Sequence, residues 1–472
     1  MRNNTHTTTR HIQYKRLGVL EEKTFPPSFN MGEILPENLN LFKEPRSLFA
    51  VSDYMHERIQ CRTALDGTTP VLEFTANADK SRYTDLNGSW FIVKAKYVKT
   101  QGGANIDQAP VVGPVQNPVN SIFRSVDMWL NNRKITPPEL NMHYISFFNQ
   151  FVSPTTYQDS QLSLSLWYPD NYETMQHANQ SDPQSVASPN KGLKKRATFF
   201  GDSREVVLIG KLFCAPHCIT RWFPPNCKFD WRFEMENYKF FTMQSNTKPD
   251  DHFRFIITDA QIWLKRLNVS PSVMAAHSSI LQSKNMIFPC RYMESRTTEV
   301  PQSSLSFKFD NIFQGSKMPT SIYVMFIDSD AKNGHLQKNP YLFDHCNLSE
   351  IRCYLGSQVL PSVLYKLNPS GKQLDMALLD TYIALGCDSS LYGPKQLIRE
   401  NLTNGVFIAG FDLSRDNHPI SNYYNSSFNA SSVGLEGIFS VATQKTYTGL
   451  FNSVCCCCLA YIKKEITYYC LF

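Results

Sequence analysis

The 472-residue chain is long enough for two domains, each of which could bury a full hydrophobic core. Apolar residues make up 42% of the chain and charged residues 19%, a balance that indicates a globular protein and excludes a disordered one. Aromatic residues reach 13%, and because they suit a pleated, half-buried surface, the composition favours β-sheet. The net charge of +6 is mild for this length, so it permits an anionic partner without requiring one.

Residues 1–40 are expected to form an N-terminal arm. Its basic residues Arg2, Arg10, Lys15 and Arg16 lie in a Thr- and Asn-rich stretch without acidic residues. This composition fits a solvated terminus, or an arm that contacts a neighbouring subunit or nucleic acid. The stretch lacks an apolar core, and no run of about 18 apolar residues occurs in the chain, so we expect neither a signal peptide nor a transmembrane helix.

A first β domain is predicted over residues 41–267. Its clearest strand is Phe229 to Glu236, where aromatic or apolar residues alternate strictly with charged ones. The Asn131-Asn132 pair is typical of a hairpin turn, and Pro137 to Gln150 shows helical spacing. Further strands are predicted at 70–76, 89–100, 121–135, 205–214 and 253–267.

A long polar excursion, residues 153–202, interrupts this first domain. Such a length inside a domain is typical of a functional or exposed insertion. Near its end lies a basic run, predicted as a loop, formed by Lys191, Lys194, Lys195 and Arg196. The run fits a solvated loop, a nuclear import signal or a contact with a polyanion.

Residues 268–285 are predicted to form a helical linker, and a second β domain of similar texture is predicted over 286–466. A helix is expected at 375–385, and 467–472 would form a C-terminal tail. Strands are predicted at 304–312, 320–329, 348–355, 405–413 and 434–442, with a final strand pair within 450–466. The fold class is therefore all-β, with two tandem β-sandwiches and short helices in the loops and at the hinge.

Motifs of catalysis are missing from the sequence. It contains no phosphate-binding loop, dinucleotide fingerprint, zinc-protease helix or nucleophile elbow. Cys214, His217, Cys218 and Cys227 have a metal-like composition, but their spacing matches no standard zinc site, and buried thiols beside a turn explain them better. We therefore expect no enzyme activity, no cofactor and no metal.

One further segment contains part of a calcium-binding pattern but lacks two of its required residues. Asp328 and Asp330 resemble the start of an EF-hand loop, but Asn333 and Asn339 stand where glycine and glutamate are required. We interpret this segment as a turn after a strand.

Several segments, taken in order, resemble the double jelly-roll major capsid proteins of Polinton (Maverick) transposons and adintovirus-like elements, similar in kind to adenovirus hexon. The resemblance covers roughly residues 47–442. The segments that carry it are YTDLNGSWFIVKAKYVK, PVQNPVNSIFRSVDMWLNNRKI, WYPDN, KGLKKR, DAQIWLKRLNVSPSVMAAH, FDNIFQGSKMPTSIYVMFIDSDAKNGHLQKNPYLFDHCNL and GVFIAGFDLS.

The resemblance implies two eight-stranded jelly rolls in one chain, three chains per pseudo-hexagonal capsomer, and an icosahedral shell around double-stranded DNA. It also implies a penton or minor capsid partner, DNA contacts through the basic arm, and assembly inside the cell, in the host nucleus. Within the chain, Ser270 to His277 would link the two domains, and Asn339-Pro340-Tyr341 would open a loop. The Cys-rich end, SVCCCCLAYIKKEITYYCLF, departs from the alternating strands expected of the family.

Three functions stay open at this point. The resemblance favours a self-assembling major capsid protein. A domesticated cellular protein with tandem β-sandwiches, binding glycan or protein partners, is the alternative. An enzyme on a jelly-roll scaffold, such as a cupin, would need clustered histidines and a carboxylate on neighbouring strands, and the sequence lacks that pattern.

Overall fold

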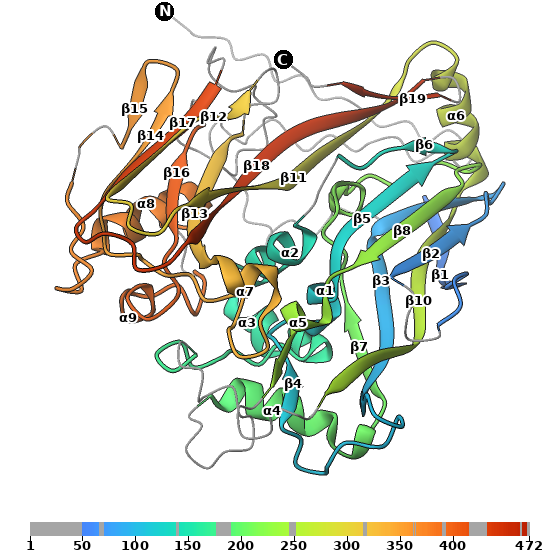
Figure 1. Cartoon of the computed structure of the whole chain (residues 1–472). Helices are drawn as coiled ribbons and strands as arrows, with labels where there is room; N and C mark the ends of the chain where they lie inside the picture. Colours follow the sequence, from blue (N-terminus) through green and yellow to red (C-terminus); the bar gives the residue numbers. More distant parts are fainter. Residues whose placement is uncertain are drawn as a thin grey trace, which may run out of the picture. The chain divides into compact units, whose positions relative to one another are not determined.

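The computed structural model of the chain describes residues 50–65, 70–137, 141–175, 190–244, 252–314, 319–361, 363, 365–388, 393–414, 432–462 and 465–469. The four expected arm residues Arg2, Arg10, Lys15 and Arg16 lie outside them. The described strands form two β-sandwiches, one built from β1 to β10 and the other from β11 to β19 (Figure 1).

The first sandwich consists of two four-stranded antiparallel sheets. One sheet has the order β1 (Val51–Gln60), β10 (Phe253–Val269), β3 (Arg82–Lys99), β7 (Val206–Gly210). The other has the order β2 (Val71–Ala76), β8 (Phe229–Met235), β5 (Phe123–Leu130), β6 (Arg133–Lys134). A separate ribbon pairs β4 (Val112–Pro114) with β9 (Thr242–Gln244).

The second sandwich repeats this plan. One sheet has the order β11 (Met286–Val300), β18 (Tyr447–Ile462), β13 (Ser321–Asp328), β16 (Ala409–Asp412), with β19 (Glu465–Tyr469) paired to β18. The other has the order β12 (Ser306–Gln314), β17 (Ser432–Phe439), β14 (Leu348–Leu355), β15 (Gln358–Leu360).

The strand orders of the two sandwiches are identical. When β4, β9 and β19 are set aside and the remaining strands of each sandwich are numbered along the chain, both sandwiches read 1-8-3-6 and 2-7-4-5. This order belongs to the jelly roll, in which two Greek keys fold into facing sheets. The all-β fold class with two tandem jelly rolls is thereby confirmed.

Aromatic side chains fill the space between the facing sheets. In the first sandwich, Phe91 of β3 and Phe233 of β8 stack with ring centroids 4.8 Å apart, and Phe74 and Phe123 meet them edge-on. The predicted alternation of β8 is confirmed, since Phe229, Trp231 and Phe233 are buried. Aromatic pairs of this kind add stability beyond the area they bury.

Helices occupy the connections. The α-helices are α1 (Pro118–Ser121), α2 (Met142–Phe151), α3 (Thr155–Asp159), α4 (Lys191–Phe199), α5 (Tyr238–Phe241), α6 (Pro271–Leu281), α7 (Ser329–Gly334), α8 (Asp375–Leu385) and α9 (Arg399–Leu402). The bounds predicted for α8 are confirmed, and the turn predicted at Asn131-Asn132 has the positive φ angles that asparagine tolerates. α2 begins later than predicted, at Met142.

One local prediction is wrong. Lys191, Lys194, Lys195 and Arg196 were expected in a loop, but they form the first turns of α4. The helix starts there because the Asn190 side chain caps it, accepting a hydrogen bond from the Leu193 amide. The buried Leu193 and Ala197 give it an apolar face that the polar composition of the run concealed.

Candidate functional site

Aromatic stacking joins the two sandwiches. The Phe147 ring of α2 lies parallel to the ring of Tyr341, with centroids 4.0 Å apart, and Tyr144 meets Tyr341 edge-on. Phe148, also on α2, packs against Tyr323 of β13 at 4.6 Å. α2 follows β6 of the first sandwich, whereas Tyr341 and Tyr323 belong to the second. We call this contact, with the polar network beside it, the inter-sandwich junction.

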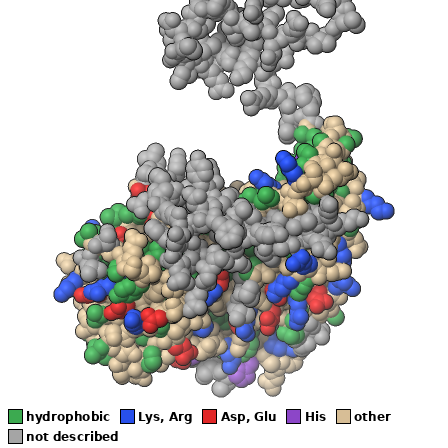
Figure 2. Space-filling model, turned by 90° about the horizontal axis from the view of Figure 1, so that it is seen from above, with side chains coloured by type: hydrophobic (Ala, Val, Ile, Leu, Met, Phe, Trp, Pro, Cys, Tyr) green, Lys and Arg blue, Asp and Glu red, His purple; other side chains and the backbone are tan. Residues whose placement is uncertain are grey.

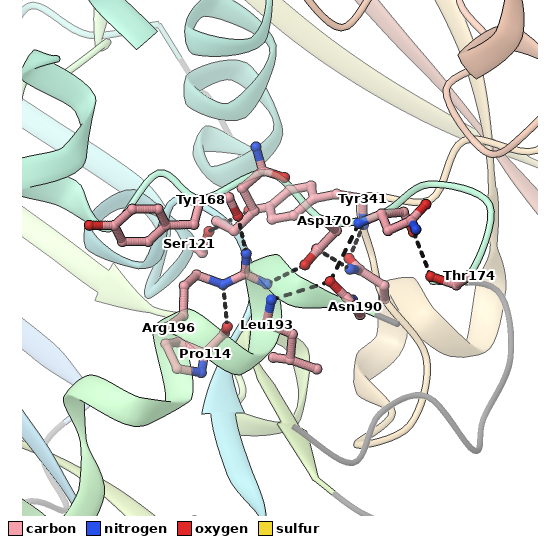
Figure 3. Close-up of polar contacts among 12 residues, drawn as sticks. Pro114, Ser121, Tyr168, Asp170, Thr174, Asn190, Leu193, Arg196 and Tyr341 are labelled. Carbon is pink, nitrogen blue, oxygen red and sulfur yellow. Dashed lines mark hydrogen bonds and ion pairs between the residues drawn. The ribbon is translucent and has the colours of Figure 1, made fainter. Parts of the chain in front are cut away.

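A buried ion pair forms the polar half of the junction (Figure 3). Arg196 Nη2 lies 2.7 Å from Asp170 Oδ1, and neither side chain is exposed to solvent. The same guanidinium donates through Nε to the Pro114 carbonyl at 2.9 Å and through Nη1 to the Tyr168 carbonyl. Full hydrogen bonding of this kind is what makes a buried charge tolerable.

Asp170 carries this network into the second sandwich. Its second carboxylate oxygen accepts a hydrogen bond of 2.8 Å from the Asn339 side chain. Two residues further on, the Tyr341 hydroxyl lies 2.6 Å from Ser121 Oγ. Burial raises the pKa of Tyr341, so its hydroxyl keeps its proton and can donate. The junction therefore fixes the second sandwich to the first through polar and aromatic contacts together.

The approach of α4 to the segment at Asp170 requires a glycine. A Cβ at position 192 would collide with the carbonyl oxygen of Pro169, so no side chain fits between helix and segment. Asn190 at the start of the helix also accepts a weak hydrogen bond from the Asn171 amide at 3.4 Å. Gly192 and Asn190 thus place Arg196 beside Asp170.

We expect Tyr341→Phe to lower the free energy of unfolding by about 1 kcal/mol, the usual contribution of one hydrogen bond. The loss stays modest because Ser121 Oγ keeps the Gln116 and Asn117 carbonyls as acceptors. Urea titration of Tyr341→Phe, Ser121→Ala and the double variant measures it. If the two single losses add fully, the hydroxyls do not interact and the assigned bond is wrong.

The predicted basic residues divide into two groups in the structure. Arg196 is fully buried in the junction, while Lys191, Lys194 and Lys195 are exposed on α4. The Lys195 ammonium lies over the Tyr168 ring, 4.0 Å from its centroid. On the described part of the face drawn in Figure 2, cationic and anionic side chains are intermixed. Of the four predicted basic residues, Arg196 is therefore inaccessible to a polyanion, and the three lysines of α4 are the ones exposed for such a contact.

The residues with a metal-like composition make structural contacts. His217 is buried, its Nε2 accepts a hydrogen bond of 3.1 Å from the Trp231 indole, and its Nδ1 lies 3.0 Å from the Leu86 carbonyl. With Nε2 as acceptor, Nδ1 carries the proton. Burial lowers the pKa of His217 to about 4 and raises the pKa of the Cys227 thiol to about 12. In the described part of the chain, no three His, Cys, Asp or Glu residues are grouped to hold a metal ion.

Asp328 occupies a helix start. Its carboxylate caps α7 through the Asp330 amide and forms ion pairs with Lys445 at 2.7 Å and Lys338 at 3.0 Å. Burial alone would raise the pKa of Asp328, but the hydrogen bonds from these lysines outweigh it and lower the pKa.

Among the described helices, none is long and apolar enough to cross a membrane.

Sequence reasoning did not identify the junction as a site. Asp170, Asn190, Ser121 and Tyr341 had no catalytic or ligand-binding pattern around them. A usable signal was nevertheless present, because the segments WYPDN, KGLKKR and NPYLFDH, which helped to carry the resemblance, meet at this one place.

Comparisons with known proteins agree with this architecture at the level of structure alone. No known family profile matches the sequence, and no curated protein matches it. Among solved structures, a chain of the Sputnik virophage matches with a TM-score of 0.62 at 12% identity, over 93% of both chains. The Faustovirus major capsid protein matches at 0.54 and 10%, over 90% of this chain and 92% of that one.

The mavirus major capsid protein matches at 0.52 and 11% identity, over 95% of this chain and 97% of that one. In each case the matched part of the chain includes both sandwiches and their connections. The chain therefore has the double jelly-roll fold found in these viral proteins.

Proposed function

We propose that this chain is a major capsid protein of a Polinton/Maverick-like or adintovirus-like element. The observation that carries the proposal is the repeated strand order of two jelly rolls joined by a buried junction. Structural similarity to the mavirus and Faustovirus major capsid proteins over nine-tenths or more of each chain supports it.

The proposed assembly is a trimer. Three chains with two similar sandwiches each would present six similar units around one axis, the outline of a pseudo-hexagonal capsomer. In this proposal, residues 41–267 and 286–466 are the two jelly rolls, 268–285 is the linker, 1–40 is an arm and 467–472 is a tail. Capsomers would pack into an icosahedral shell around double-stranded DNA, with a penton or minor capsid protein as a further partner.

The basic arm residues would contact packaged DNA or neighbouring subunits. Contacts of this kind depend on charge alone, so they are blind to base sequence and weaken steeply with salt. Assembly would take place inside the cell, in the host nucleus, and the protein would reside in the virion capsid.

The full chain, expressed and purified, tests the proposal by light scattering coupled to size-exclusion chromatography and by negative-stain electron microscopy. The expected result is a mass of three chains and particles of pseudo-hexagonal outline. A chain that stays monomeric over a wide concentration range would contradict the proposal and would favour a cellular binding protein.

A further inference from the structure

An exposed aromatic cluster lies on the outer surface of the first sandwich. Tyr54 and His56 of β1 and Trp263 of β10 form it, with successive ring centroids 5.9 and 6.4 Å apart. Tyr54 is 64% exposed and Trp263 is 42% exposed. Arg58 pairs with Trp263 across the two strands. We call these four residues the β1–β10 face.

The corresponding surface of the second sandwich is covered. In the shared strand order, β11 corresponds to β1 and β18 to β10. There α2 of the first sandwich lies on the sheet, with Asn149 Nδ2 4.0 Å from Met293 Sδ and the Phe148 ring packed at a tilt against Tyr323. Met293 and Tyr323 are both buried, and α8 of the same sandwich also covers Tyr323. Among the described residues, this sheet-covering contact is thus seen on one of the two equivalent sheets of the chain.

α2 belongs to the insertion between the fifth and sixth jelly-roll strands of the first sandwich. The same insertion in the second sandwich, between β15 and β16, contains α8. The inner side of α8 is fixed to its own sandwich, since Thr381 Oγ1 bonds the Ile408 carbonyl at 3.0 Å and Ala384 accepts from Tyr323 at 2.7 Å. Its outer side presents Met376 and Leu379, which are 44% and 46% exposed.

The two exposed surfaces also have complementary charge. α8 contains Asp375 and Asp380 and no basic residue. Asp375 is paired with Arg399 of α9 at 2.6 Å, so Asp380, which accepts a hydrogen bond from the Tyr365 hydroxyl, is the carboxylate of this helix that no described cation neutralises. Around the β1–β10 face, Arg58 and Lys94 share the single carboxylate of Asp259 at 3.9 and 3.6 Å, which leaves one cation in excess. Aromatic and arginine side chains are enriched at protein interfaces, and complementary charge selects the partner.

We propose that α8 of one copy lies on the β1–β10 face of a second copy and repeats between chains the contact that α2 makes within one. The inference rests on the proposed self-assembly and assigns its surfaces. The contact joins two different surfaces, so each copy offers one of each and a chain of contacts can close into a ring. In a ring of three copies, contacts within chains alternate with contacts between chains.

Two variants of the full chain test the assignment by light scattering. Trp263→Glu disables the sheet surface and Leu379→Glu disables the helix surface. Each variant alone should fall from a three-chain mass to a one-chain mass, because removal of a central aromatic or apolar contact weakens binding by at least about tenfold. An equimolar mixture should recover a two-chain mass, since one intact sheet surface and one intact helix surface remain to pair.

Matched controls carry the same charge change elsewhere on the surface. Trp222→Glu and Leu305→Glu replace side chains that are 38% and 62% exposed, and both should keep the three-chain mass. Tyr54→Glu repeats the sheet test at a more exposed position, and circular dichroism verifies that every variant is folded.

The outcomes separate this inference from the proposed function. If the unmodified chain forms trimers and Trp263→Glu, Tyr54→Glu and Leu379→Glu also do, self-assembly stands and the surfaces assigned here are wrong. If each variant is monomeric but the mixture shows no two-chain species, the contact between unlike surfaces is overturned. A monomeric unmodified chain overturns the inference together with the proposed function.

Discussion

Replacing Arg196 by methionine should lower the free energy of unfolding by about 3–5 kcal/mol, the usual cost of leaving a buried partner charge uncompensated. The substitution leaves the Asp170 carboxylate buried with Asn339 as its remaining side-chain partner. It also removes the two N–H donors by which the Arg196 guanidinium bridges the Pro114 and Tyr168 carbonyls. Urea titration followed by tryptophan fluorescence measures the loss.

Two controls separate burial from charge. Lys194→Met changes an exposed residue of the same helix, and Lys395→Met breaks an ion pair with Asp159 whose side chains are 51% and 57% exposed. Each should cost less than about 1 kcal/mol. Arg196→Met/Asp170→Asn should recover part of the loss, because the unpaired charge is then absent. A loss below about 1 kcal/mol for Arg196→Met would mean that the Arg196–Asp170 ion pair does not stabilise the junction.

The sheets of this fold could be predicted because their signal is local. Side chains alternate with a period of two in β8, and the apolar or aromatic half of that alternation lies in the core. The start of β3 was missed because Asp85, Asn87 and Gly88 are turn-forming residues. In the structure they form an irregularity where Asp85 accepts hydrogen bonds from the Gly88 amide and the Lys265 ammonium.

The junction could not be predicted from local signals. Arg196 lies in a run of lysines, and its burial depends on Asp170, which is 26 residues away in the sequence. Asp170 in turn is bonded to Asn339, which lies 169 residues after Asp170. The spacing of apolar residues along the chain does not reveal partners that are distant in the sequence, so the sequence favoured a solvated loop for the run that contains Arg196. The ordered set of segments that carried the family resemblance contained the right residues without showing what they contact.

Two buried histidines should make the protein sensitive to acid. Burial lowers the pKa of His217 to about 4 and that of His143 to about 3, both below the ordinary value of 6.5. Below pH 6.5 the unfolded chain therefore binds protons that the folded chain does not, and stability falls as the pH falls. The two differences correspond to about 3 kcal/mol for His217 and about 5 kcal/mol for His143. For His217 the loss should be nearly complete at pH 4, and for His143 it should continue toward pH 3.

His217→Gln and His143→Gln isolate these contributions, because carboxylates that titrate in the same range are common to all variants. At pH 7 each variant should be less stable than the parent, since His217 loses its contacts with Trp231 and Leu86 and His143 loses its packing on Phe240. Between pH 6.5 and 4, however, each variant should lose less stability than the parent does. Parallel curves for the parent and both buried-histidine variants would show that the two imidazoles are protonated as readily in the folded chain as in the unfolded one, and the assigned burial would then be wrong.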